Sequence, residues 1–187
     1  MYNNYKIVVN TAAGRRRYMQ YLIPFVVAND IVDRYDIWVH THNCADIEFF
    51  KQVANAYDKV NLIMQPDGMV NNNRTINPFY KYCCDEDTIY FKLDDDICWM
   101  EDDMIEKMVK FRIEEPQYFI VSPLVINNPV CTYILQASEV IKSPQYVGVQ
   151  NVLPWFWESG NFAYRLHNWF LRTFLENDAN EFPPPHV

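Results

Sequence analysis

Three consecutive aspartates, Asp94, Asp95 and Asp96, are the residues of this chain whose types and spacing point most directly to chemistry. They follow an apolar, β-branched and aromatic run over residues 89–91 that is typical of a buried strand. Because side chains alternate along a strand, we expect Asp94 and Asp96 to share a face and Asp95 to point away. Two carboxylates on one face repel each other unless a cation lies between them. The pattern therefore predicts an oxygen-ligand site for Mg²⁺ or Mn²⁺, ions that also bind substrate phosphates.

The same aspartates have a plainer interpretation as an acidic turn in which one of them caps the next helix. The buried strand before the cluster favours the metal site, because a turn needs no such strand. An EF-hand calcium loop fits poorly, since that loop has Gly at its sixth position and Glu at its twelfth. Counting from Asp94, these positions hold Trp99 and Ile105.

A second candidate site combines aromatic residues with one carboxylate. Trp155, Phe156 and Trp157 directly precede Glu158, where apolar residues at helical spacing begin. Aromatic platforms commonly hold sugar rings, so Trp155 and Trp157 are candidate sugar-binding residues and Glu158 is a candidate general base. The alternative is a core edge at which Glu158 stabilises the helix N-terminus through its dipole.

The pattern of elements predicts an α/β domain with a largely parallel central sheet flanked by helices. Strands are expected at residues 6–10, 36–41, 60–64, 89–91, 117–122 and 130–136, with helices between the earlier strands, a short helix at 79–84 and a helix after 160. Ligands of such sheets bind at the carboxyl ends of the strands. We therefore expect the loop at Thr11, residues 40–43, Gln65 and residues 94–96 to face one cleft.

Basic and metal-ligating residues also follow the early strands. Residues 15–17 are three arginines after the first strand, where they could hold phosphates or simply form a solvated helix start. His40, His42 and Cys44 would share one face if the second strand continued through them, which makes a zinc site conceivable. Strand-end packing is favoured, because no fourth ligand is evident.

Composition narrows the function classes. The chain has 187 residues, half of them hydrophobic, which is enough for one domain with a real core. Its net charge of −8 opposes nonspecific binding to nucleic acid or to an anionic membrane. Five cysteines without a disulfide-like spacing, no signal peptide and no apolar run of membrane-spanning length predict a cytoplasmic protein. We expect one domain over residues 1–182 and a stiff Pro-rich tail at 183–187 that could lead to further domains.

Two motifs give the chain a family resemblance. YFKLDDDI at residues 90–97 resembles the DxD motif of the GT-A nucleotide-sugar glycosyltransferases, and WES at 157–159 is similar to their later acidic motif. The order of strands and helices before the aspartates also fits. Within that family, the chain most resembles the compact glycosyltransferase domains of large algal viruses that modify capsid proteins. The resemblance implies a single Rossmann-like GT-A domain with a mostly parallel mixed sheet, and the host cytoplasm as its location.

The resemblance also implies an activity. It points to a hexosyltransferase that uses a UDP- or GDP-sugar donor, a glycan or glycoprotein acceptor, and Mn²⁺ or Mg²⁺ on the diphosphate. Asp96 would ligate the metal, Asp94 would contact the ribose or the metal through water, and His186 stands where many members have a further ligand. The candidate nucleotide-binding residues are Thr11, Ala12, Arg15, Gln65, Arg74, Asp94 and Asp95.

Other functions remain open on the sequence. Glu158 as the base implies inversion at the anomeric carbon, and a retaining reaction is the alternative. A nucleotidyltransferase would also use carboxylate-bound metal against a phosphate. A noncatalytic sugar-binding module would use Trp155 and Trp157 as its platform and a structural cation at Asp94 and Asp96.

Overall fold

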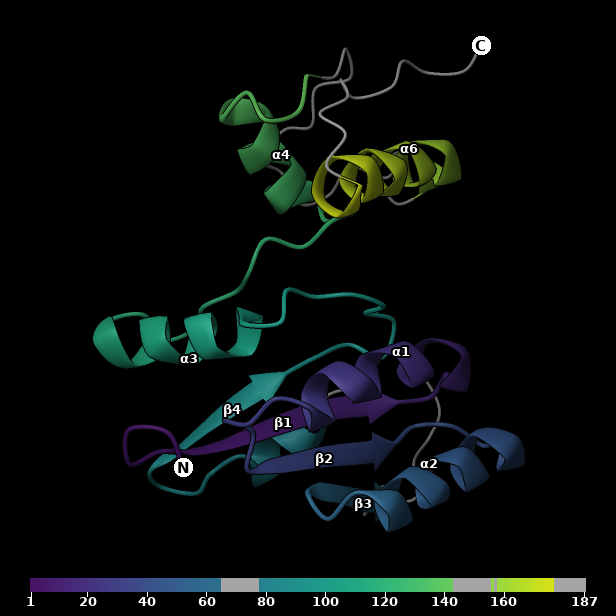
Figure 1. Ribbon diagram of the computed structural model, residues 1–187, viewed down its shortest axis with the longest axis vertical. Helices are drawn as coiled ribbons and strands as arrows, with labels where there is room; N and C mark the ends of the chain where they lie inside the picture. Colours follow the sequence, from purple (N-terminus) through teal and green to yellow (C-terminus); the bar gives the residue numbers. More distant parts are fainter. Residues whose placement is uncertain (65–77, 143–155, 157, 177–187) are drawn as a thin grey trace. The chain divides into compact units, whose positions relative to one another are not determined.

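Four parallel strands form the centre of the N-terminal part of the chain, in the order β3-β2-β1-β4 (Figure 1). The strands are β1 (Lys6–Ala13), β2 (Arg34–Val39), β3 (Val60–Met64) and β4 (Thr88–Lys92). The chain winds outward from β1 to β3 and then returns to place β4 on the other side of β1. The carboxyl ends of β1 and β4 therefore flank the topological switch point, where ligands of open α/β sheets bind.

The computed structural model describes residues 1–64, 78–142, 156 and 158–176. The chain divides into two compact units, Met1–Val121 and Ser122–Val187, where we predicted one domain over residues 1–182. The predicted Pro-rich tail at 183–187 lies outside the described residues. No helix in the described ranges combines the length and the apolar character needed to cross a bilayer.

Three helices cover one face of the sheet: α1 (Arg16–Val27), α2 (Cys44–Ala56) and α3 (Met104–Glu114). Alternate residues of β1, such as Ile7 and Val9, are fully buried in the same cluster as Leu22, Phe50 and Val109 from these helices. The helices follow from apolar residues at helical spacing. Pro24 lies inside α1 without ending it.

The other face of the sheet packs against a short 3₁₀ helix, η1 (Pro78–Tyr82). The Trp38 ring stacks on the rings of Phe79 and Tyr82, with centroids 5.9 and 5.4 Å away. The indole N–H of Trp38 donates to the Asn10 side-chain oxygen, 2.8 Å away. This stacking holds the return segment that leads into β4 against the sheet.

Most of the elements predicted for the first unit are confirmed. The α/β class is confirmed, and the described strands are all parallel where the resemblance implied a mostly parallel mixed sheet. β3 has the predicted bounds, while β1 is longer than predicted. Residues 11–13 were expected in a loop, but parallel pairing with β2 continues to the pair Ala13 and Val39. The loop after β1 therefore begins only at Gly14.

Two strand predictions are wrong. Residues 130–136 form part of a helix, α4 (Pro129–Ala137), in which the Asn128 side chain accepts hydrogen bonds from the N–H groups of Val130 and Cys131. This cap, together with Pro at the first helical position, outweighs the β-branched composition of the segment. Residues 117–122 form a turn and an irregular segment after α3, with Phe119 89% exposed, so no strand buries them.

The second unit has a core of its own. Its helices include α4 and α6 (Gly160–Phe170), and the chain continues from α6 into a π-helical turn, η2 (Leu171–Leu175). The predicted helix after residue 160 is thus confirmed, and it begins with the Ser159 hydroxyl accepting from the Phe162 N–H at 3.2 Å. The buried residues that form this core are Leu135, Ile141, Phe156, Phe162, Leu166 and Trp169.

Candidate functional site

The loops that follow β1 and β4 are joined by hydrogen bonds at the switch point. The Gly14 N–H donates to Asp95 Oδ2 at 2.9 Å, and Arg15 Nε donates to both Asp95 oxygens at 3.1 and 3.2 Å. One residue beyond β4, the Leu93 N–H donates to the Asn10 carbonyl at 2.9 Å and keeps the segment beside β1. Two segments about 80 residues apart in the chain thus meet at one point on the sheet edge.

Gly14 is required by close packing at this point. A Cβ added to Gly14 would lie 2.8 Å from the carbonyl oxygen of His40 and 3.7 Å from Asp95 Oδ2. The His40 backbone is itself fixed, because its N–H donates to the Ala13 carbonyl at 2.7 Å. Any side chain here would separate the loops that follow β1, β2 and β4, so glycine is the residue that permits their contact.

The three aspartates point in ways that the sequence did not predict. β4 ends at Lys92 and a turn follows at residues 95 and 96, so strand alternation does not extend through the cluster. Asp95, expected to point away, is buried, with 8% exposure, and is held by the loop after β1. Asp96 is half-exposed and lies 3.0 Å from Arg15 Nη2, while the exposed Asp94 pairs with Lys92.

Arg15 is the cation that pairs with both Asp95 and Asp96 at this site. Its hydrogen bond to Asp95 raises the pKa of the guanidinium above its ordinary value, against the lowering effect of burial, and the charges of Asp95 and Asp96 add to the increase. The side chain is nevertheless 45% exposed, so its outer N–H groups lie within reach of a solvent-borne ligand. Nearby, partial burial lowers the pKa of His40, opposed by the negative charge of Asp95.

The predicted contacts of Thr11 and Ala12 with a nucleotide stay predictions. Thr11 is a fully buried β1 residue, and its hydroxyl accepts a hydrogen bond from the Tyr35 hydroxyl at 3.0 Å. Burial raises the pKa of that tyrosine, which keeps it a neutral donor. Ala12 is half-buried on the opposite face of β1. The backbone of this strand end, rather than the Thr11 hydroxyl, is therefore what borders the switch point.

The donor set determines which cation the site could hold. Among the described residues, no three His, Cys, Asp or Glu side chains converge to form a closed metal site. The exposed carboxylates of Asp94 and Asp96 fit an ion such as Mg²⁺ or Mn²⁺, which needs one or two protein carboxylates and takes its other ligands from water and phosphate. The zinc interpretation rested on a strand face that does not exist, because Cys44 begins α2 and its N-cap is Asn43.

The other candidate residues belong to the second unit or lie outside the described residues. Glu158 is an exposed residue of the second unit, adjacent to the N-cap of α6. Those that lie outside the described residues are Gln65, Arg74, Trp155, Trp157 and His186. Sequence reasoning missed Gly14. Its signal was present, since Gly14 is one of four glycines in the chain and follows a predicted strand.

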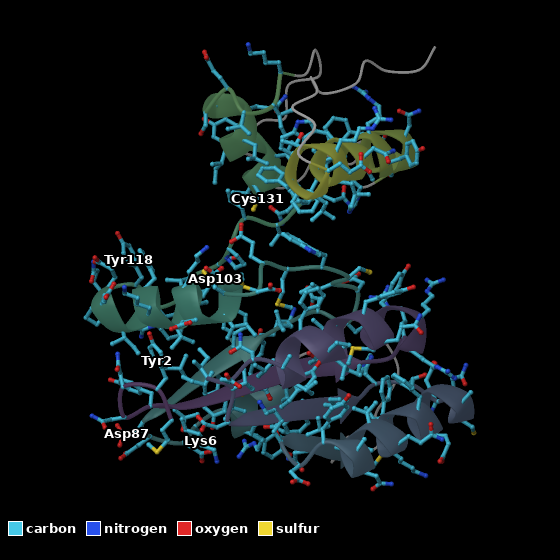
Figure 2. All side chains as sticks on the ribbon, in the orientation of Figure 1. Tyr2, Lys6, Asp87, Asp103, Tyr118 and Cys131 are labelled. Carbon is cyan, nitrogen blue, oxygen red and sulfur yellow. The ribbon has the colours of Figure 1, made fainter. Side chains whose placement is uncertain are left out.

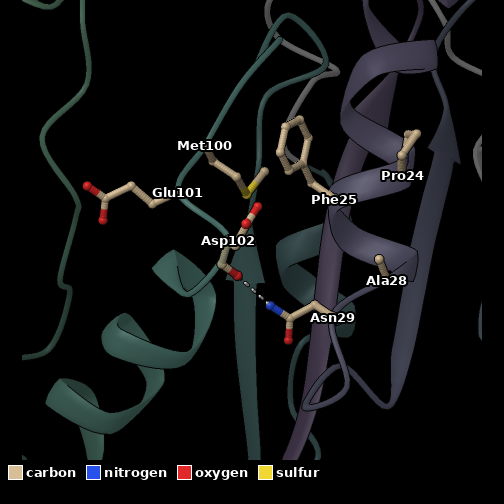
Figure 3. Close-up of a pocket in the computed structure, with 7 residues that line it drawn as sticks. All are labelled: Pro24, Phe25, Ala28, Asn29, Met100, Glu101 and Asp102. Atoms are coloured by element: carbon tan, nitrogen blue, oxygen red, sulfur yellow. Dashed lines mark hydrogen bonds between the residues drawn. The ribbon is translucent and has the colours of Figure 1, made fainter. Parts of the chain in front are cut away.

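A pocket elsewhere in the first unit is lined by the C-terminal part of α1 and the segment before α3 (Figure 3). Its lining residues are Pro24, Phe25, Ala28, Asn29, Met100, Glu101 and Asp102. The Asn29 amide donates to the Asp102 carbonyl at 3.4 Å across it. None of the residues singled out from the sequence lines this pocket, so the switch point remains the candidate site.

Comparison of the chain with known protein families, with curated proteins and with solved structures finds no match. The function therefore has to be argued from the residues at the switch point.

Proposed function

We propose that this protein is a metal-dependent glycosyltransferase that transfers a sugar from a nucleotide-sugar donor to a glycan or glycoprotein acceptor. One observation carries the proposal. Gly14 and Arg15 after β1 meet Asp95 and Asp96 after β4 at the switch point of a parallel sheet. That is where this architecture binds nucleotides, and the residues there combine a cation for phosphate with carboxylates for a metal. The GT-A assignment itself rests on the DxD-like motif.

Local charge at the start of α1 supports an anionic ligand in a chain whose net charge is −8. Arg15, Arg16 and Arg17 lie at the N-terminus of α1, where the helix dipole also favours negative charge. The Arg16 and Arg17 guanidinium carbons lie 5.0 and 4.6 Å from the ring centroids of Phe49 and Tyr18. Arg15 is the one of the three that reaches the aspartates, so we assign it to the diphosphate.

The remaining roles follow from exposure and chemistry. A bound Mn²⁺ or Mg²⁺ would supply Lewis-acid stabilisation of the leaving nucleoside diphosphate. Asp96, half-exposed beside Arg15, would be its protein ligand, and Asp94 would contribute directly or through water. Asp95 is already committed to Gly14 and Arg15, so it would hold the loop rather than the ion. Glu158 is proposed as the base that takes the proton of the acceptor hydroxyl, as in an inverting reaction.

The experiment that tests this proposal is a panel of UDP- and GDP-sugars incubated with the purified protein, with hydrolysis and transfer measured with Mn²⁺ and with EDTA. We expect slow Mn²⁺-dependent release of UDP or GDP from one donor. Glu158→Gln should keep donor binding but lower transfer by roughly 10²-fold, the effect of losing a positioned base. Release of pyrophosphate from a nucleoside triphosphate would instead identify a nucleotidyltransferase. Sugar binding that needs neither nucleotide nor metal would identify a binding module.

A further inference from the structure

One guanidinium is shared between two carboxylates at the switch point. Arg15 Nε lies 3.1 and 3.2 Å from the Asp95 oxygens, and Arg15 Nη2 lies 3.0 Å from Asp96 Oδ2. The two carboxylates differ in their surroundings. The Asp95 side chain is 10% exposed and also accepts from the Gly14 N–H, whereas the Asp96 side chain is 51% exposed.

Because of this difference, the contact of Arg15 with Asp95 is stronger than its contact with Asp96. A carboxylate that is buried and receives several hydrogen bonds, one of them from backbone, loses much if its partner leaves. A half-exposed pair gains little, because water screens it and can replace it. Arg15 should therefore stay on Asp95 and release Asp96 when a stronger competitor for the Asp96 oxygens arrives.

We propose that Arg15 is an internal counter-ion that a divalent cation must displace from Asp96, and that Asp95 is the positioning residue that keeps Arg15 in place. The inference rests on the proposed function in one respect, namely that Asp96 is a metal ligand. Before the cation binds, the single positive charge of Arg15 offsets part of the negative charge of the two carboxylates. Afterwards it remains anchored to Asp95 with free N–H donors beside the ion.

A coupling between two ligands follows from this exchange. A diphosphate offers the released N–H groups of Arg15 new acceptors, so its arrival lowers the cost of freeing Asp96 for the cation. By linkage, the cation strengthens binding of the diphosphate by the same factor. Arg15 thereby favours the two ligands together and disfavours the cation alone.

The test measures binding of Mn²⁺ alone, by calorimetry and by the electron paramagnetic resonance signal of free Mn²⁺. The variants are Arg15→Gln and, as a matched control, Arg17→Gln, which removes the same charge from a side chain that lies over the Tyr18 ring. Removing a unit charge a few ångströms from a divalent ion should tighten Mn²⁺ binding by about tenfold. Arg17→Gln should leave it near that of the unaltered protein. With Mn²⁺ saturating, Arg15→Gln should bind UDP more weakly than Arg17→Gln does.

These opposite effects on two ligands are what a purely structural ion pair would not produce. The inference is overturned if folded Arg15→Gln binds Mn²⁺ no more tightly than Arg17→Gln does. This holds even if the unaltered protein binds UDP with Mn²⁺, as the proposed function requires. Conversely, if Arg15→Gln binds Mn²⁺ more tightly but the protein binds no nucleotide, the proposed function is contradicted and the inference about Arg15 stands. If Arg15→Gln does not fold, Arg15→Lys serves instead. It keeps the charge without the fork on Asp95, so Mn²⁺ affinity should stay within a few-fold of the unaltered protein while UDP binds more weakly with Mn²⁺ saturating, and unchanged UDP binding contradicts the account.

Discussion

The two ends of β1 are tied down in the same way, by an aspartate that accepts hydrogen bonds from neighbouring backbone. At the amino end, Asp33 accepts from the Ile7 N–H at 2.8 Å and pairs with the amino group of Met1 at 2.6 Å. At the carboxyl end, Asp95 accepts from the Gly14 N–H at 2.9 Å and pairs with Arg15. Each aspartate fixes a loop to the strand, which is a structural task.

The two ends of β1 differ in the negative charge that is left unbalanced after the aspartate has paired with its cation. At the amino end, Asp33 pairs with the Met1 ammonium group. Lys6 and Asp87, which are joined at this end by a backbone hydrogen bond of 2.8 Å, are labelled in Figure 2. At the carboxyl end, one guanidinium serves both Asp95 and the half-exposed Asp96. Asp96 is exposed to solvent and shares its one counter-ion with Asp95. The negative charge left unbalanced there would favour the binding of a cation. The same tie thus stabilises both ends of the strand, and the carboxyl end is where we propose the metal site.

The largest effect should come from filling the space at Gly14. Gly14→Ala places a methyl group 2.8 Å from the His40 carbonyl and should lower the free energy of unfolding by about 3 kcal/mol, the upper range for overpacking. Gly160→Ala is the matched control, because a Cβ there meets nothing within 4 Å and lies at the start of α6. It should be neutral or stabilising. Urea unfolding of both variants decides, and equal midpoints would show that the loops are not in contact.

Removing the two aspartates compares the ends directly. Asp95→Ala leaves the Gly14 N–H without its acceptor and Arg15 with Asp96 as its partner, and should cost about 2 kcal/mol, because hydrogen bonds to a buried charge are the costly ones to lose. Asp33→Ala should cost about 1 kcal/mol, since its ammonium partner is exposed and screened. Thermal unfolding measures both. A larger loss for Asp33→Ala would mean that the carboxyl end is not the stronger tie.

The pH dependence of stability should be a smaller effect, and the two ends of β1 should contribute to it in different pH ranges. Burial lowers the pKa of His40, so the unfolded chain takes up a proton near pH 6.5 while the folded chain resists it. Stability should therefore fall as the pH drops from 7 toward 5, and His40→Gln should flatten that slope.

At the amino end, Asp33 is partly desolvated, which raises its pKa, but its hydrogen bonds to the terminal amine and to the Ile7 N–H outweigh this effect and lower the pKa overall. Its contribution is present above about pH 4 and is lost below it. Urea midpoints at several pH values test both, and an unchanged slope in His40→Gln would contradict the first.

The sequence was informative where a local pattern and the tertiary environment agree. An apolar run at residues 60–64 became β3, and the apolar helical pattern after residue 160 became α6. It was misleading at residues 130–136, where β-branched composition suggested a strand. The structure buries Pro129, Thr132 and Leu135 at helical spacing instead. Asn128 and Pro129 are a local helix-start signal, but its weight against the β-branched composition is decided by packing in the second unit, which spacing alone does not reveal.

The candidate site shows the same limit. The position of the aspartates after a strand could be predicted, but not the residue at which that strand ends. The hydrogen bond from Gly14 to Asp95 joins residues 81 apart, and a contact of that range cannot be seen from spacing. As a result, the sequence assigned the inward direction to Asp94 and Asp96, whereas Asp95 is the buried member of the three.

The central claim is that the carboxyl end of β1 binds a nucleotide through a metal, and calorimetric titration with UDP tests it most directly. Titrations with Mn²⁺ and with EDTA would compare the unaltered protein, Asp96→Ala, and Asp33→Ala as the carboxylate control from the other end of the strand. We predict Mn²⁺-dependent binding in the unaltered protein and in Asp33→Ala, and its loss in folded Asp96→Ala. Equal Mn²⁺-dependent binding by Asp96→Ala, or binding that EDTA does not diminish, would contradict the account.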